Sequence, residues 1–366
     1  MEKKSKILIF ILIVLIVLGI ATHVFLTPST VDNVGGKNIT DMINRTVEVP
    51  SSISSVVATS PPMTTVIYMI SPNKLTAVNF QWDDDELVYV PSQYQNLPVV
   101  GGWYGTQEGS YEEFIASEPD IVIESIDEGG DGDLSTVEER QDKFGQIPVV
   151  AVRDTTNIER INESILFIGE VIGASDAAQS LVDFNNHYLD EVHRKAPDIS
   201  QQRTVYYAVG NDGLRTYPSG SPHGQLIDLV GGINVADSLG QSNTTSGVQV
   251  SIEQVISWNP DVIITTDPTF YANVYNNSNW AQIRAVQNHE VYLSPQSPFN
   301  WFDRPIGANM IIGLPWTAKV IYPDVYSDID LVNATMEFYS NFYHYDLSQD
   351  QAREILLNSG LNESSL

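Results

Sequence analysis

The segment FNWFDRP (299–305) contains the strongest candidate for ligand chemistry in this chain. Arg304 carries a planar guanidinium that can contact carboxylate, catecholate or amide oxygens of a bound molecule. Asn300 and Trp301 precede it in the same segment. The alternative interpretation is a packed Trp301 beside an Asp303–Arg304 surface ion pair, which would contribute little.

Aromatic residues follow three predicted strands of the first half of the chain. Trp82 follows one strand, and Trp103 with Tyr104 follows another. Each could simply cover the core, but together they predict a stacking surface for a flat ligand at one edge of a sheet. Weaker candidates in the second half are Tyr207, Arg215, Tyr217 and Asp267, with Phe270 and Tyr271.

Direct metal binding and catalysis have weak support. The six histidines show no ligand-like spacing, which disfavours a bare transition metal. The acidic stretch from Asp127 half-matches a calcium loop through Asp127, Asp131 and Glu138, but Gly129 stands where a ligand belongs, which favours a solvated loop. No G-x-S-x-G, phosphate loop or H-E-x-x-H motif indicates an enzyme.

A near-repeat indicates how these residues are positioned. SYEEFIASEPDIVIES (110–125) returns as SIEQVISWNPDVIITT (251–266). Each copy begins with a Ser that can cap a helix, runs about two turns to a Pro, and enters a β-branched run. A short helix feeding a buried parallel strand is part of an α/β unit, so two copies predict two similar lobes.

The remaining pattern predicts an α/β fold of two Rossmann-like lobes. Strands are expected at 56–62, 75–80, 97–102, 120–125 and 147–152, and again at 204–209, 261–266 and 290–295. One long helix is expected between the lobes, interrupted at Gly173 and ended by Pro197. The predicted divisions are a tether (31–48), an N-terminal lobe (49–156), the linking helix (157–197), a C-terminal lobe (198–345) and a C-terminal helix and tail (346–366).

Composition excludes one class of partner. The 366 residues carry a net charge of −28 with 18 Lys and Arg in total, so no basic surface for nucleic acid can be drawn. The chain has no cysteine, which removes disulfides, thiolate metal sites and cysteine-linked lipid anchoring.

The N-terminus predicts export. Three lysines precede an uncharged apolar run over 7–26, long enough to span a bilayer, so residues 1–30 are expected to be an anchor or a signal segment. The body would then lie outside the cytoplasm at the cell surface. Seven N-x-S/T sequons agree with export: Asn38, Asn44, Asn162, Asn243, Asn276, Asn333 and Asn362.

Two lobes that each carry E-x6-P-D before a strand, joined by one long helix, resemble the substrate-binding proteins of ABC importers for iron chelates, haem and vitamin B12. The matching stretches are VVATSPP, LPVVGGWYG, VGGINVAD and FNWFDRP. The resemblance implies a rigid helical spine, a ligand cleft between the lobes, and delivery to a permease dimer with a cytoplasmic ATPase. It implies no cofactor other than the transported ligand.

The resemblance also assigns roles to particular residues. FNWFDRP is similar to the W-F-E-R of cobalamin binders, which places Arg304 and Asn300 at the ligand, although the family has Asp where this chain has Asn300. Trp103 matches a ligand-contacting Trp. Glu112 and Glu253, in the two repeats, match the carboxylates that dock on the permease. The alternative is that they only complement their helix dipoles, and Glu113 beside Glu112 leaves the first assignment open.

The expected function is therefore capture of a ferric siderophore, haem or corrinoid for an ABC importer. Within the same fold the alternative is an oxyanion such as molybdate or tungstate, whose small site would use backbone amides and few aromatics. An exported enzyme or a surface scaffold is the alternative from another class.

Overall fold

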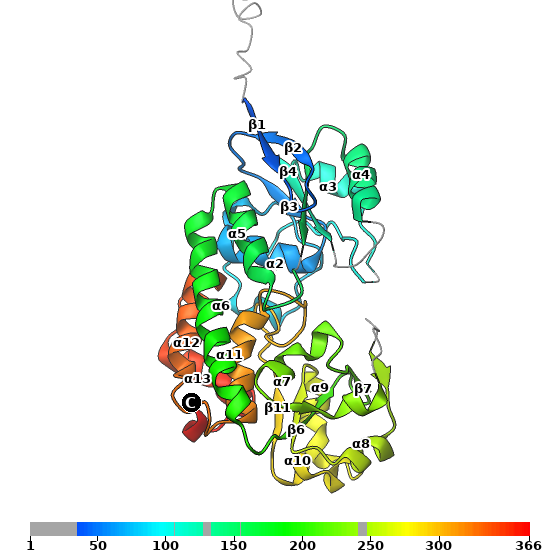
Figure 1. Ribbon diagram of the computed structural model, residues 1–366, viewed down its shortest axis with the longest axis vertical. Helices are drawn as coiled ribbons and strands as arrows, with labels where there is room; N and C mark the ends of the chain where they lie inside the picture. Colours follow the sequence, from blue (N-terminus) through cyan, green and yellow to red (C-terminus); the bar gives the residue numbers. More distant parts are fainter. Residues whose placement is uncertain (1–34, 106, 127–132, 154, 241–246) are drawn as a thin grey trace, which may run out of the picture.

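The computed structural model describes residues 35–105, 107–126, 133–153, 155–240 and 247–366. Two α/β lobes lie one above the other, and helices join them along one side (Figure 1). The predicted fold class is confirmed. The predicted anchor at 7–26 lies outside the described residues, and among those residues no helix is long and apolar enough to cross a membrane.

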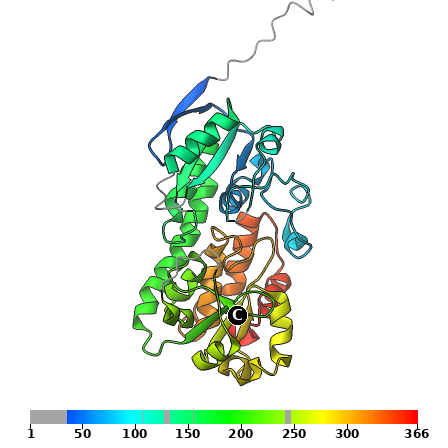
Figure 2. The same ribbon diagram turned by 90° about the vertical axis from the view of Figure 1, so that its right-hand side faces the viewer.

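The N-terminal lobe is built on a parallel sheet of three strands. Their β-branched apolar residues are buried almost throughout, as expected for a sheet covered on both faces. An antiparallel hairpin precedes the sheet and extends from the outer end of the lobe (Figure 2). The hairpin is β1 (Gly36–Thr40) and β2 (Thr46–Pro50), and the sheet order is β3 (Val56–Ala58), β4 (Ile121–Ile126), β5 (Val149–Arg153).

Two predicted strands of this lobe are reduced to single bridges. The segment 75–80 lies beside β3 and the segment 97–102 lies beside 75–80, each joined by a single bridge, Val56 with Leu75 and Val78 with Val99. Pro98 has no N–H to extend a ladder, which limits the pairing. The helices of this lobe are α2 (Pro61–Ile70), α3 (Tyr111–Ala116) and α4 (Asp133–Phe144).

The predicted linking helix consists of two helices, α5 (Ile161–Ile172) and α6 (Ser175–Lys195). Gly173 separates them because it adopts a left-handed conformation, φ 72°, which ends α5. α5 packs against α6, and α6 alone continues past both lobes (Figure 1). With 21 residues it is about 30 Å long, enough to run the length of a small domain.

The C-terminal lobe repeats the same plan on a larger sheet. Four parallel strands form its centre, with a short antiparallel ladder beside them. The sheet order is β11 (Val291–Leu293), β10 (Val262–Thr265), β6 (Thr204–Ala208), β8 (Ile233–Asn234); the ladder pairs β7 (Arg215–Thr216) with β9 (Val248–Gln249); and the helices are α7 (Gln225–Leu229), α8 (Ile252–Trp258), α9 (Pro268–Asn273) and α10 (Arg284–Gln287).

The last helices return to the junction of the two lobes. α11 (Met310–Ile321) packs on α6 and α7, and α12 (Leu331–Phe338) packs on α11 and α13 (Gln349–Asn358). A π-helical turn, Tyr339–Tyr343, follows α12 and contacts α2 of the N-terminal lobe. There the hydroxyl of Tyr68 donates to the carbonyl of Tyr343 over 3.3 Å. The predicted boundary at 345 therefore cuts through a group of helices that serves both lobes.

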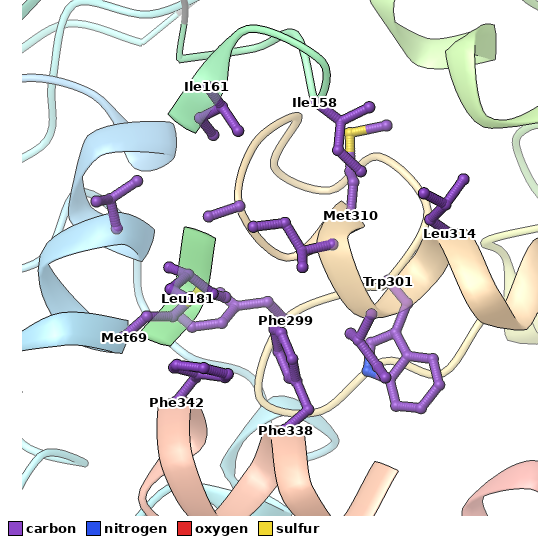
Figure 3. Packing of buried hydrophobic residues seen from close by; sticks show 14 of the residues in the cluster. Met69, Ile158, Ile161, Leu181, Phe299, Trp301, Met310, Leu314, Phe338 and Phe342 are labelled. Atoms are coloured by element: carbon purple, nitrogen blue, oxygen red, sulfur yellow. The ribbon is translucent and has the colours of Figure 1, made fainter. Parts of the chain in front are cut away.

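One hydrophobic core runs through this junction. Figure 3 shows Met69 from the N-terminal lobe, Leu181 from α6, Phe299 and Trp301 from the segment after β11, and Phe338 beside them. Every residue of α2 is buried, because the helix is enclosed by its own sheet and by these C-terminal helices. The lobes are therefore held together by a shared interior rather than by a flexible linker.

Candidate functional site

The segment 299–309 lies where the two lobes meet. A Cβ added to Gly307 would lie 3.4 Å from Pro62, at the start of α2, and 3.4 Å from the carbonyl of Thr155. α2 directly follows β3, so this contact places the carboxyl end of β3 beside the segment. Open α/β sheets bind ligands outside the carboxyl ends of their strands, so the segment occupies the expected location.

A second contact closes the junction from the C-terminal lobe. The side chain of Gln225, at the start of α7, accepts from the amide of Ile158 over 2.9 Å. Its amide nitrogen donates to the carbonyl of Thr156, also over 2.9 Å. These bonds tie α7 to the chain that enters α5.

A buried ion pair is the centre of the site. Asp303 is fully buried, and its Oδ2 lies 2.6 Å from Nδ1 of His223 and 3.5 Å from the guanidinium of Arg304. Burial raises the pKa of Asp303, but the charge of Arg304 and the hydrogen bond from His223 outweigh it, and the net pKa is lowered. The carboxylate therefore stays ionised and accepts the Nδ1 proton of His223.

This assignment fixes what His223 can offer. A carboxylate only accepts hydrogen bonds, so Nδ1 carries the proton, and the nearby Arg304 nitrogen, 3.0 Å away, is a close neighbour rather than a donor to it. Within the described parts of the chain, Nε2 of His223 takes part in no hydrogen bond. In the neutral ring that nitrogen carries no proton and can only accept a hydrogen bond.

Tyrosines hold the other side of the cluster. The ring of Tyr217 stacks on His223 with centroids 4.0 Å apart, and its hydroxyl lies 3.4 Å from Arg304 Nη2. Tyr207 packs behind it against Phe302, and burial raises the pKa of Tyr207 well above its ordinary value. The Arg304 side chain stays 41% exposed, so a fixed cation faces solvent from a largely buried frame.

The structure buries three of the aromatic residues that were predicted to contact a ligand. Trp82 is 4% exposed and packs among Tyr68, Phe80 and Phe299, and Trp301 and Tyr207 are fully buried. Their ring faces contact protein, so in this structure they offer no surface to a flat ligand. Tyr207 supports Tyr217, and Trp301 anchors the segment in the shared core.

Trp103 is half-buried, and other side chains of the protein already pack against its ring. Phe114 stacks on it at 5.2 Å, and the guanidinium of Arg140 lies 3.7 Å from the ring centroid. Arg140 also lies 3.5 Å from Glu124, whose pKa is raised to about 7 because burial outweighs the charge of Arg140. Tyr104, next along the chain, is half-buried. Trp103, Phe114, Arg140 and Glu124 form a packed cluster beside β4, the central strand of the N-terminal sheet.

The other predicted contacts have separate positions. Asn300 is buried, and its side-chain oxygen accepts from the amides of Phe302 and Asp303 at 2.8 and 3.2 Å, so it shapes the turn that presents Arg304. Arg215 is exposed on β7. Asp267 caps α9 by accepting the amide of Phe270 over 2.9 Å. Among the described residues, no hydrogen bond or ion pair joins Arg215 or Asp267 to the Asp303 cluster.

Sequence reasoning missed His223 as a site residue. It lies in SPHG (221–224), at the entry to α7, and its partner Asp303 is 80 residues further along. The spacing of the histidines argued only against a metal site and gave no reason to single out His223. The available signal was a His flanked by Pro and Gly at a helix entry in the lobe that carries Arg304.

The repeated units adopt the same local structure. Ser110 and Ser251 each accept a helix amide over 3.3 Å, from Glu113 and Gln254. Glu112 and Glu253 follow at equivalent positions and are exposed. Glu113 is exposed beside Glu112, so the first lobe presents two carboxylates and the second lobe one, and docking on a permease stays a prediction.

The structure adds no support for a calcium site in the acidic stretch from Asp127. Asp127 and Asp131 lie outside the described residues, and Glu138 is exposed on α4. Among described residues, no group of three or more His, Asp or Glu could hold a metal ion.

The comparisons with known proteins agree with this architecture. The family model described as periplasmic binding protein matches residues 56–298, and the chain belongs to that family. Binding proteins of this family work with the permease and ATPase of an ABC importer, and a substrate-binding protein of such an importer is the function that follows.

Three relatives illustrate the range of the family. An ABC transporter solute-binding protein from Sulfurospirillum deleyianum has a TM-score of 0.78 and 30% identity, covering 87% of this chain and 98% of that one. The molybdate-binding protein MolA of Haemophilus influenzae is 26% identical over 336 residues, 86% of this chain and 93% of that protein. A cobalamin-binding protein of Halobacterium salinarum is 29% identical over 179 residues, 48% of this chain and 45% of that protein.

Proposed function

We propose that this chain captures a small oxyanion outside the cytoplasm and delivers it to an ABC permease. The observation that carries the proposal is the donor set at the lobe junction. Arg304 presents a half-exposed guanidinium and Tyr217 a hydroxyl beside it, while His223 donates to Asp303 and helps to hold this arrangement. Donors fixed before the ligand arrives lose little freedom on binding, which favours a compact charged ligand.

The burial of the aromatic residues supports the same choice. A corrinoid, haem or siderophore would be held by broad stacking contacts, and we expected Trp82, Trp103 and Tyr104 to supply part of them. Trp82 is buried in the core, and the ring of Trp103 is covered by Phe114 and Arg140. The similarity to a molybdate-binding protein along most of both chains agrees with a small anion. A metal chelate is the alternative ligand.

Ligand titration tests the proposal directly. Molybdate, tungstate, sulfate and phosphate are titrated into the purified protein by calorimetry, in parallel with cyanocobalamin, haem and a ferric siderophore. We expect one of the tetrahedral anions to bind with a stoichiometry of one. Binding of a chelate in place of every anion would refute the oxyanion proposal and restore the chelate interpretation.

Variants of Arg304 identify the site. A charge-assisted hydrogen bond contributes about 1.5–3 kcal/mol, so Arg304→Ala should weaken binding roughly ten- to a hundredfold. Arg304→Lys should recover part of the affinity, because an ammonium keeps the charge but not the planar fork. Arg194→Ala is the matched control, since Arg194 lies on the surface of α6 and is 61% exposed. Equal losses in the Arg304 and Arg194 variants would place the anion elsewhere.

A further inference from the structure

The structure divides the described sequons into two groups by two criteria. An oligosaccharyltransferase needs the Asn side-chain nitrogen free of intramolecular bonds, and it must reach the hydroxyl two residues later. Both requirements can be checked for six of the seven sequons. Asn243 lies outside the described residues.

Four sequons meet both criteria. In each, the Asn and the hydroxyl residue two positions later are exposed, and no described residue accepts a hydrogen bond from the Asn nitrogen. Asn44 lies in the turn of the hairpin with φ 64°, and Asn276 ends a 3-10 turn, so both lie in turns on the surface. The four pairs are Asn38 with Thr40, Asn44 with Thr46, Asn276 with Ser278, and Asn362 with Ser364.

Two sequons fail both criteria. Asn162 donates to Asn186 over 2.7 Å, and Ser164 is fully buried with its hydroxyl bonded to the carbonyl of Arg153. Asn333 donates to Asp330 over 2.6 Å. Its partner Thr335 is fully buried and donates to the carbonyl of Leu331 over 2.8 Å. Both lie in helices, α5 and α12, whose turns bury the required hydroxyl.

We propose that Asn38, Asn44, Asn276 and Asn362 carry N-linked glycans added to the folded chain, and that Asn162 and Asn333 do not. The donor is a lipid-linked oligosaccharide. A bond forms from the Asn side-chain nitrogen to the anomeric carbon, and the bond from that carbon to the lipid phosphate oxygen breaks. The lipid phosphate leaves with the electron pair of that bond, and the amide gives up one proton to water. No oxidant or reductant is involved.

Two of the proposed glycans would lie on the hairpin of β1 and β2, where they would cover an open strand edge. β1 pairs with β2 alone among the described strands, and four of its five residues are exposed. An open edge strand is a template for pairing with another chain. Glycans on Asn38 and Asn44 would cover this edge and block that pairing.

The experiment uses the full chain purified from the organism that encodes it. Glycopeptide mass spectrometry is expected to find glycans on the four accessible asparagines and bare Asn162 and Asn333. In the intact mass, Asn44→Gln should remove one glycan, whereas Asn162→Gln and Asn333→Gln should change it only by the side-chain difference. Thr46→Ala should remove the same glycan as Asn44→Gln, and Thr46→Ser should retain it.

Each outcome decides one part of the proposal. A glycan on Asn162 or Asn333 overturns the two criteria, and a vacant residue among the four overturns the assignment of that residue. Four vacant residues overturn the proposal as a whole. Ligand titration of protein made in a host without such a transferase separates this question from the proposed function, because no glycan site belongs to the Arg304 cluster.

Discussion

Asp120 and Asp261, which directly precede the strands of the two repeated units, make similar contacts, and their substitution is the most informative stability experiment. Asp120 Oδ2 accepts from the amide of Ser54 at 2.6 Å, its hydroxyl at 2.9 Å and the amide of Ser55 at 2.9 Å. Asp261 Oδ2 accepts from the amide and hydroxyl of Thr204 at 3.0 and 2.9 Å. Each carboxylate therefore fixes the chain entering the neighbouring strand, β3 or β6.

The loss of stability expected on substituting each aspartate follows from these hydrogen bonds. Hydrogen bonds to a charged group contribute about 1.5–3 kcal/mol when well shielded, and both side chains are partly exposed, so we expect Asp120→Asn and Asp261→Asn to cost about 1 kcal/mol each. The two sites lie in different lobes and share no partner, so the double variant should cost the sum, about 2 kcal/mol.

The direction in which the stabilisation by these two aspartates changes with pH can be stated. Burial raises the pKa of each aspartate, but the hydrogen bonds outweigh it, and Arg284 adds to the effect at Asp261, so both pKa values are lowered below 3.8. A lowered folded-state pKa means that the stabilisation is present above the ordinary pKa and is lost as pH falls through the folded value. The difference between wild type and variant should therefore shrink between pH 7 and about pH 3.

Urea unfolding followed by tryptophan fluorescence at the two pH values measures this difference. The exposed Asp84, changed to Asn, is the matched control and should have no effect at either pH. Equal destabilisation at both pH values would refute the role of the charge. No destabilisation at pH 7 would refute the role of the contacts.

Two further predictions concern delivery and the N-terminal segment. Reversing Glu112 and Glu253 together to Lys should abolish transport in cells while ligand affinity stays unchanged; a matching loss of affinity would move these carboxylates into the binding site. Deleting residues 1–30 should give a soluble, monomeric protein that unfolds cooperatively, because the described cores draw on none of these residues. Aggregation of that shortened chain, seen by light scattering, would contradict it.

The local structure of the repeats could be predicted because its causes are local. A Ser that caps a helix, a Pro that ends it and a β-branched run act within about ten residues, and both copies fold as expected. The sequence also suggested Arg304 and Tyr217 as ligand contacts, and the structure brings them together although 87 residues separate them. Their role at a ligand stays a prediction.

The depth of the aromatic residues could not be predicted in the same way. Trp82 follows a strand end, which is all the sequence shows, but Tyr68, Phe80 and Phe299 enclose it. Phe299 comes from another lobe, more than 200 residues away in the chain. His223 was missed for a related reason. It belongs to the site because it bonds to Asp303, and no local sequence pattern links these two residues.

The enclosure of α2 has a consequence for how the chain is made. Tyr68 on α2 bonds to Tyr343, 275 residues later. At a synthesis rate of about 5–20 residues per second, roughly 15–55 s pass between the two leaving the ribosome. During this time the apolar helix lacks its cover, so the N-terminal half cannot complete its fold ahead of the rest. A message that stops before the codon for Tyr343 should therefore yield a chain with α2 uncovered, a substrate for chaperones and proteases rather than a shortened binding protein.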